Sequence, residues 1–333
     1  MAKNNELDML NGALLPKILM FSLPLALTGI LQLLFNAADV IVVGKFAGST
    51  SLAAVGATSA LVNLLTGAFI GISVGVNILV ARYAGCRDDA RVERAVHSAI
   101  ALSLVLGVVT FLLGFFLSTP MLEWMDTPDD VLALASLYLR IYFIGIPGAL
   151  IYNFAAAILR AYGDTKRPLI FLAISGVLNV FLNLFFVIVC ELDVAGVAIA
   201  TVVSQYVAVV LILICLVRQE GPAKLKLREI RLHPDEALRM IQIGLPAGLQ
   251  SVVFNISNVM VQSCVNSFGA DVIAANTAAT NIAAFTYTAM NSVFHASITF
   301  TSQNLGARRY DRVMKIFWAC QATVLLIGIP LCI

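Results

Sequence analysis

The stretch LPLALTGILQLLFNAADVIVVGKFAG, residues 23–48, decides the fold of this 333-residue chain. It opens with Leu23-Pro24, and the same pair returns 222 positions later as Leu245-Pro246, at the head of another long apolar segment. The two copies then stay in step, with Asn36 on Asn258, Phe46 on Phe268 and, after a slip of one residue, Ala54 on Ala275, Gly85 on Gly306 and Arg91 on Arg312. Spaced matches of this kind indicate a duplicated membrane unit.

The composition is that of a protein embedded in lipid. Hydrophobic residues make up 60% of the chain and charged residues 12%, and the mean hydropathy is +0.94. A helix of about 20 apolar residues crosses the hydrocarbon core of a bilayer. We expect such spans near residues 16–43, 52–81, 95–117, 131–159, 168–190, 194–217, 240–266, 272–303 and 314–333.

The basic residues predict the orientation of these spans. Nineteen of the 21 Lys and Arg residues lie before span one or after spans two, four, six and eight, whereas the alternate loops carry mostly Asp and Glu. By the positive-inside rule the N-terminus is cytoplasmic. The basic runs are short and adjacent to the membrane, which argues against a nucleic-acid partner. The first span is too long for a cleavable signal peptide, so we expect it to serve as the insertion signal.

The repeat also predicts the domain organisation. We expect an all-α polytopic protein with two six-helix lobes, related by a pseudo-two-fold axis along the membrane normal. The first lobe would span residues 1–217, a polar cytoplasmic linker residues 218–239, and the second lobe would begin at 240. Because the second copy runs only to Ile333, about nine of twelve helices are expected in this chain.

Asp39 is the one acidic residue inside a predicted span, and it lies on a polar stripe with Thr28, Gln32 and Asn36. A charge within a span is costly, so such residues usually face a cavity; the alternative places Asp39 in the outer headgroup region. Other stripes in the first half are Ser175-Asn179-Asn183, Thr201-Ser204-Gln205 and Tyr138-Tyr142-Asn153. Their oxygens suit a hard cation or a proton relay, although amides and hydroxyls also bind helices together in lipid.

The second half has polar stripes but no acid in its spans. Asn258, Gln262, Asn291 and His295 are its candidates for a cavity between the lobes, where they would face Gln32, Asn36, Tyr142 and Asn153 of the first half. His295 can titrate near neutral pH, or can serve as a structural contact. Pro24 and Pro147 are candidate hinges, because proline interrupts helical hydrogen bonding.

Motifs for enzymes and bound cofactors are weak in this sequence. Residues 71–75 read G-I-S-V-G, but a nucleophile elbow needs a strand-to-helix turn, whereas this one lies inside an apolar helix with glycines at positions 67, 71 and 75. Close helix packing explains those glycines better. The six cysteines are scattered without a C-x-x-C pair, so neither a disulfide framework nor a zinc site is expected.

Several strings resemble the multidrug and toxic compound extrusion (MATE) transporters. They are NAADVIVVGKFAG (36–48), ILRAYGDTKRP (158–168), NVFLN (179–183) with GVAIATVVSQ (196–205), and QNLGARR (303–309). The resemblance covers the whole chain and implies two lobes that alternate between inward and outward openings and export organic cations against a proton or sodium gradient. It also implies that Asp39 is the coupling carboxylate, with Asn179 and Thr201 as its amide and hydroxyl partners.

Two departures from the family pattern bear on the coupling ion. Asn183 occupies a position that is often aspartate in prokaryotic members, and Phe254 stands near the place where another branch has a glutamate. Asp39, with Asn179, Asn183 and Thr201, is thus the candidate ion-coupling site, taking H+ or Na+ and no other metal or cofactor.

The function expected is secondary antiport of organic cations by a monomer in the inner membrane of a prokaryote, with no enzymatic step. The alternatives are a flippase for lipid-linked saccharides, for which Arg140 is the available cation, and an intramembrane hydrolase built on Ser73 and His295.

Overall fold

The computed structural model describes residues 6–266 and 270–332, apart from some side chains in α2 and α7 to α9. Within these ranges the chain is helical and contains no strand. The long helices are α1 (Leu14–Val42), α2 (Gly48–Cys86), α3 (Asp89–Glu123), α4 (Asp129–Ala161), α5 (Lys166–Leu184), α6 (Asp193–Val217), α7 (Pro234–Asn266), α8 (Ala270–Gly306) and α9 (Tyr310–Cys332). The shorter elements are the π-helical turns η2 (Val43–Ala47) and η3 (Phe185–Val189) and the 3-10 turn η4 (Leu227–Glu229).

Local sequence explains where several of these helices begin. The Asp88 side chain accepts a hydrogen bond from the backbone N–H of Arg91 (3.1 Å) and caps α3. Asp129 and Asp130 lie in the first turn of α4, where negative charge complements the helix dipole. Helix α7 begins at Pro234, within the linker that the sequence analysis placed at 218–239. Proline is favoured in a first helical turn, so residues 234–239 are helical instead of linker.

Seven helical stretches of the described chain are long and apolar enough to cross a membrane. One of them, Leu14–Cys86, contains α1, η2 and α2 together. Helix α8 is not among the seven, although the sequence predicted a span at 272–303. Its 37 residues are long enough, but Asn276, Thr280, Asn291 and His295 lower its hydropathy.

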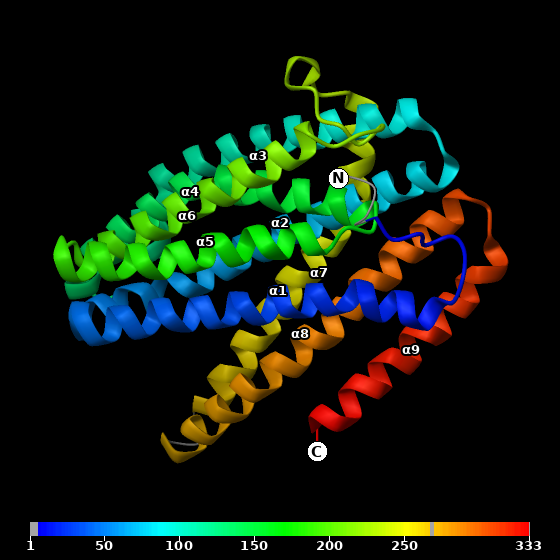
Figure 1. Ribbon diagram of the computed structural model, residues 1–333. Helices are drawn as coiled ribbons and strands as arrows, with labels where there is room; N and C mark the ends of the chain where they lie inside the picture. The colour runs from blue at the N-terminus through cyan, green and yellow to red at the C-terminus, as the bar shows by residue number, and fades with distance from the viewer. Residues whose placement is uncertain (1–5, 267–269, 333) are drawn as a thin grey trace.

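Helices α1 to α6 form one bundle, and α4 lies at its centre in contact with α2, α3 and α6 (Figure 1). The second half of α4 is buried almost without interruption from Phe154 to Leu159. The loop after α4 is fixed by Asp164, which is fully buried and accepts hydrogen bonds from the backbone N–H groups of Lys166 (3.2 Å) and Arg167 (3.1 Å). The tightly packed bundle supplies a rigid frame for the polar residues inside it.

Helices α7 and α8 lie beside this bundle, and α9 packs against α8 and α1 (Figure 1). The crossing of α2 and α7 depends on small residues, because a Cβ atom at Gly71 would collide with the backbone of Gly248 and one at Gly75 with the backbone of Met240 and Gly244. Ser73, between those glycines, donates its hydroxyl to the Ile70 carbonyl of its own helix (2.7 Å). The G-I-S-V-G string therefore sits in a helix-packing surface.

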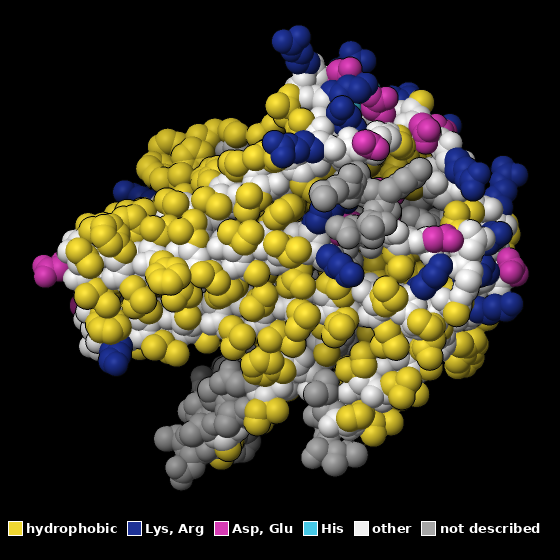
Figure 2. All heavy atoms as spheres, in the orientation of Figure 1, with side chains coloured by type: hydrophobic (Ala, Val, Ile, Leu, Met, Phe, Trp, Pro, Cys, Tyr) yellow, Lys and Arg dark blue, Asp and Glu magenta, His cyan; other side chains and the backbone are white. Residues whose placement is uncertain are grey.

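Basic side chains gather at one end of the molecule, while apolar side chains cover much of its flank (Figure 2). We call this the basic end; it contains the loops after α2, α4 and α8 and the linker before α7. Here the two sets of helices meet closely, since a Cβ atom at Gly85 would collide with the Gln303 backbone. Toward the opposite end, the tip of α7 and α8 lies apart from α1 and α2 (Figure 1).

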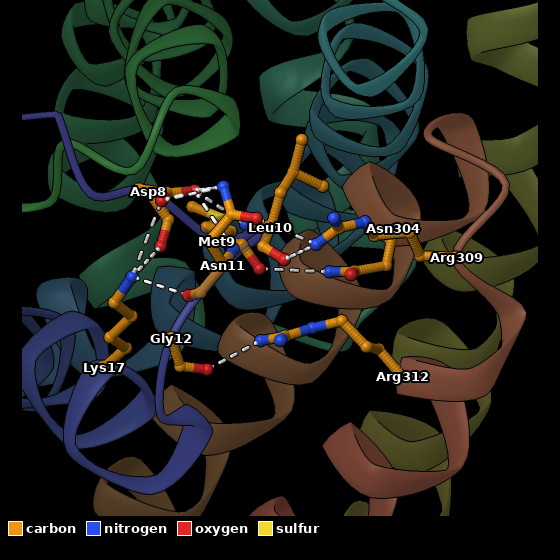
Figure 3. A network of polar contacts seen from close by, with 9 residues as sticks. All are labelled: Asp8, Met9, Leu10, Asn11, Gly12, Lys17, Asn304, Arg309 and Arg312. Carbon is orange, nitrogen blue, oxygen red and sulfur yellow. Dashed lines mark hydrogen bonds and ion pairs between the residues drawn. The ribbon is translucent and has the colours of Figure 1, made fainter.

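The N-terminal segment, residues 6–12, bridges these two parts of the molecule at the basic end (Figure 3). Arg309 donates to the Leu10 carbonyl and to Asn11 Oδ1 (2.9 Å), and Arg312 donates to the Gly12 carbonyl (3.0 Å). Asn304 of α8 donates to the Met9 carbonyl (3.2 Å). On the other side, Lys17 of α1 donates to the carbonyls of Asp8 and Asn11.

Candidate functional site

A continuous chain of hydrogen bonds joins the four residues predicted to couple to an ion. Asn183 of α5 donates from Nδ2 to Oδ1 of Asp39 on α1, and lies 3.3 Å from Oδ1 of Asn179. Asn179 donates to Oγ1 of Thr201 on α6 (3.4 Å). The hydroxyl of Thr201 donates in turn to the Val197 carbonyl of its own helix (3.0 Å). The structure thus brings together three helices through side chains up to 162 positions apart in the sequence.

The site lies inside the first bundle. Asn183 is fully buried and Asn179 is 6% exposed, whereas Asp39 is half-buried. Asp39 forms no ion pair with any residue that the structure describes, so its carboxylate faces the Asn183 amide without a compensating charge. An unpaired carboxylate in an apolar bundle favours binding of a proton or a cation, because burying an uncompensated charge costs free energy.

Two tyrosines of α4 complete the surroundings of Asp39. The rings of Tyr138 and Tyr142 stack with centroids 6.1 Å apart, and both lie close enough to Asp39 to interact with it electrostatically. Thr66 of α2 lies near the Tyr142 side chain. Thr66 was not predicted from the sequence, although Ser59, Asn63, Thr66 and Ser73 follow one another at spacings of 4, 3 and 7 along one face of α2.

One buried acceptor at the site has no partner. Oδ1 of Asn183 lies out of contact with solvent and accepts no hydrogen bond. A buried unsatisfied oxygen costs about 1–3 kcal/mol. The amide turns its nitrogen toward Asp39 and Asn179, so this oxygen is left without a hydrogen bond from the described residues.

Both π-helical turns lie immediately beyond this site. η2 follows α1 shortly after Asp39, η3 starts two residues after Asn183, and the two turns contact each other. A π-helical turn carries one extra residue per turn and is frequent at functional sites, because it alters the direction of neighbouring side chains. The pair thus marks the place where α1 and α5 depart from regular geometry.

The residues predicted to line a substrate cavity differ in their exposure and in their hydrogen-bond partners. Gln32, Asn36 and Asn258 are exposed, and Asn291 and His295 are half-buried. Asn153 donates to the Ala149 carbonyl of its own helix (2.8 Å), and Gln262 accepts from Asn276 across α7 and α8 (3.2 Å). His295 lies close enough to Arg160 to feel its charge, and no ion pair of His295 with a carboxylate occurs among the described residues. Helix α1 does contact α8, because a Cβ atom at Gly29 would meet the Thr288 side chain.

Neither predicted hinge breaks its helix. Pro24 lies inside the continuous helix α1, where the Thr28 hydroxyl donates to the Pro24 carbonyl (2.8 Å). Pro147 lies inside α4, where a Cβ atom at Gly107 of α3 would meet it. Each proline removes one backbone hydrogen bond from its helix, so the helix is easier to bend at that position.

Taken together, a bundle of long apolar helices with a buried polar site defines a multi-pass membrane transporter fold. The profile of the MatE family matches residues 24–185 and 246–333, and the chain belongs to that family.

Two curated bacterial relatives, both from Bacillus subtilis (strain 168), illustrate the match. The "Probable multidrug resistance protein YpnP" is 31% identical over 268 residues, which cover 80% of this chain and 59% of that protein. The "Probable multidrug resistance protein YoeA" is 27% identical over 304 residues, covering 89% of this chain and 66% of that protein. The chain therefore spans about 60% to two thirds of the length of these relatives.

Solved structures share the fold. One described as the "Outward-facing conformation of a multidrug resistance MATE family transporter of the MOP superfamily" superposes with a TM-score of 0.90 at 24% identity, covering 98% of this chain and 72% of that one.

Proposed function

We propose that this protein takes part in secondary active efflux of organic cations, exchanging them for H+ or Na+ by alternating access. Asp39 would be the coupling group, and Asn183, Asn179 and Thr201 would hold it in place. The relatives named above are described as multidrug resistance proteins, which supports this substrate class.

One observation carries the proposal: the hydrogen-bonded chain that runs from Asp39 through Asn183 and Asn179 to Thr201. A carboxylate without a basic partner binds either the coupling ion or a positively charged substrate, but binding both would leave an excess positive charge in an apolar bundle. Competition of this kind couples entry of one cation to exit of the other.

The arrangement of the helices supports alternating access. The helices meet tightly at the basic end and separate toward the other end (Figure 1). If the basic end faces the cytoplasm, as the positive-inside rule requires, this conformation opens outward. Rocking about the α2 and α7 crossing would close that side and open the other.

The alternative functions find less support in the structure. A flippase for lipid-linked saccharides needs cations facing its cavity, but Arg140 donates to Ser118 (3.2 Å) and Thr119 (3.1 Å) of α3. A hydrolase based on Ser73 would need a base beside its hydroxyl, which instead donates to the carbonyl of Ile70.

The experiment replaces Asp39 with asparagine, which keeps the shape of the side chain and removes its charge. We expect D39N to abolish efflux of ethidium driven by an imposed pH or sodium gradient, and to make ethidium binding in detergent independent of pH and sodium. Asp126→Asn is the matched control, because Asp126 is exposed in the turn before α4 and tolerates the same change. Gradient-driven efflux by D39N at the rate of the control would rule out Asp39 as the coupling group.

A further inference from the structure

A cavity of about 620 Å³ lies at the basic end, between the first turns of α3 and the linker before α7. Arg94 and His97 line it from α3, and Lys226, Arg228, Arg231 and His233 line it from the linker. Glu93 and Glu229 also line the cavity, whereas Leu227, Ile230 and Leu232 of the segment KLREIRLH (residues 226–233) do not. Neither the coupling site nor the predicted substrate cavity includes any of these residues.

Two hydrogen-bonded anchors hold this segment, which we call the pinned loop, in place. At one end the backbone N–H of Lys226 donates to Nε2 of His97 (3.1 Å), whose Nδ1 lies 2.7 Å from the Glu93 carbonyl. At the other end the backbone N–H of His233 donates to the Ser98 hydroxyl (3.0 Å). His97 and Ser98 are both buried, so the loop is fastened to α3 at two adjacent positions. A loop fixed in this way loses little conformational entropy when a ligand binds.

The charges around the cavity leave three guanidinium groups available. Lys226 is neutralised, since its ammonium pairs with Glu93 and with Glu229 (3.3 Å). Arg94, Arg228 and Arg231 form no ion pair with any residue in the described ranges, and all three are exposed. Arg94 and Arg231 each use Nε in a hydrogen bond, to the Ala90 carbonyl (3.4 Å) and to His233 Nε2 (3.3 Å), so their terminal nitrogens remain available. Arg94 lies one helical turn before His97 and Ser98, so it shares their face of α3 and points toward the pinned loop. Three unpaired guanidinium groups around one cavity favour a phosphate group, which arginine binds through paired N–H donors.

Apolar side chains on the pinned loop favour a phosphate that belongs to a lipid. Leu227 is 61% exposed and Leu232 is 44% exposed, in immediate sequence contact with Arg228 and Arg231. Figure 2 shows Lys and Arg collected around the linker beside the apolar flank of the bundle. A soluble phosphate makes no apolar contact with exposed leucines, whereas a phospholipid has acyl chains directly below its headgroup that can contact them.

We propose that the cavity between α3 and the pinned loop binds the phosphate of an anionic phospholipid headgroup, with Arg94, Arg228 and Arg231 as its ligands and Leu227 and Leu232 against the acyl chains. A lipid bound there contacts both the first bundle and the linker that leads to α7. It would stabilise the joint between the two parts of the molecule at the membrane surface.

The test measures lipid binding by native mass spectrometry of the detergent-solubilised protein, titrated with phosphatidylglycerol or with zwitterionic phosphatidylcholine. We expect wild type to prefer phosphatidylglycerol, and the variant R94Q/R228Q/R231Q to lose about a hundredfold in affinity, since each basic residue near an anionic surface contributes roughly 1 kcal/mol. The matched control R218Q/K224Q/K315Q removes the same charge at the same end of the molecule. Its three residues are exposed, and their side chains form no hydrogen bond or ion pair among the described residues. The control should bind phosphatidylglycerol as wild type does. The single change R228Q covers the case of a misfolded triple variant, and should weaken binding about fivefold.

Two further arms separate the sources of the phosphate. Leu227→Ser with Leu232→Ser should weaken phosphatidylglycerol binding while leaving thermal stabilisation by glycerol phosphate, if any, unchanged. Equal losses in the triple variant and its control would reduce the cavity to general surface charge and overturn the proposal. Displacement of the lipid by millimolar glycerol phosphate, or equal binding of phosphatidylcholine, would overturn the lipid assignment.

Discussion

At the scale of single residues, the coupling site depends on amide groups as much as on its carboxylate. Asn183 donates to Asp39 and, through the same nitrogen, approaches Asn179, while its own oxygen stays unsatisfied. An amide at this position can hold Asp39 in place but cannot add charge. The charge of the site therefore depends on the residue at position 183, and under the proposed mechanism that charge would decide between H+ and Na+.

Asn183→Asp should increase the sodium dependence of transport. A second carboxylate beside Asp39 makes a stronger site for a hard cation, and mutual repulsion disfavours the empty, doubly ionised state. The measurement is ethidium binding or efflux as a function of sodium concentration at fixed pH. Asn153→Asp is the control, since Asn153 donates to a carbonyl of its own helix rather than to Asp39. A sodium response that is identical in the two variants would place residue 183 outside the ion site.

At the scale of helices, periodicity in the sequence anticipated the hydrogen-bonded cluster of Asp39, Asn183, Asn179 and Thr201 and few of the other contacts. Asn179 and Asn183 are one turn apart, so they must share a face of α5, and the cost of a charge in lipid predicts that Asp39 faces them. Thr66 was left out of the prediction although its polar stripe on α2, with Ser59, Asn63 and Ser73, can be read from the sequence, because the stripe contains no charged residue to single it out. The anchoring of the pinned loop by His97 and Ser98 could not be predicted from the sequence either, because no periodicity connects residues more than 120 positions apart.

The crossing of α2 and α7 gives a test at this scale. Gly71→Ala places a Cβ atom against the Gly248 backbone, which cannot move without shifting a whole helix. Overpacking of this kind costs about 1–3 kcal/mol, so the thermal midpoint in detergent should fall. Gly56→Ala on the same helix is the control, since a Cβ atom there meets nothing within 4 Å. The control should be neutral or slightly stabilising, because alanine is the better helix former. A thermal midpoint for Gly71→Ala as high as that of the control would show that α2 and α7 do not pack closely.

At the scale of the whole molecule, the N-terminal segment closes the basic end (Figure 3). Asp8 stabilises its turn: burial acts to raise the pKa of the Asp8 carboxyl, but hydrogen bonds from Asn11 and Leu10 and the nearby Lys17 charge outweigh burial and lower it. Because the pKa is lower in the folded state, Asp8 contributes its full stability above the ordinary carboxyl pKa of about 3.9. That contribution is lost as the pH falls through the lower, folded value.

The segment accepts these hydrogen bonds mainly through its backbone carbonyls, which a mutation cannot remove. The bonds can therefore be removed only at their donors, the arginines between α8 and α9. Arg309→Gln with Arg312→Gln removes the donors to Leu10, Asn11 and Gly12, while Arg308→Gln changes the neighbouring exposed arginine and leaves those bonds intact. Amide hydrogen exchange should therefore rise in residues 8–12 of the double variant at neutral pH and stay at the wild-type rate in the control.

If a carrier must open this end to load its substrate, the same double variant should favour that opening. The Cys86 sulfur contacts the Gly306 carbonyl across the closure (3.1 Å), so labelling of Cys86 should become faster. Unchanged exchange and labelling in the double variant would mean that the remaining contacts, the close approach at Gly85 and Gly306 and the Asn304 bond to Met9, hold the basic end shut without the arginines.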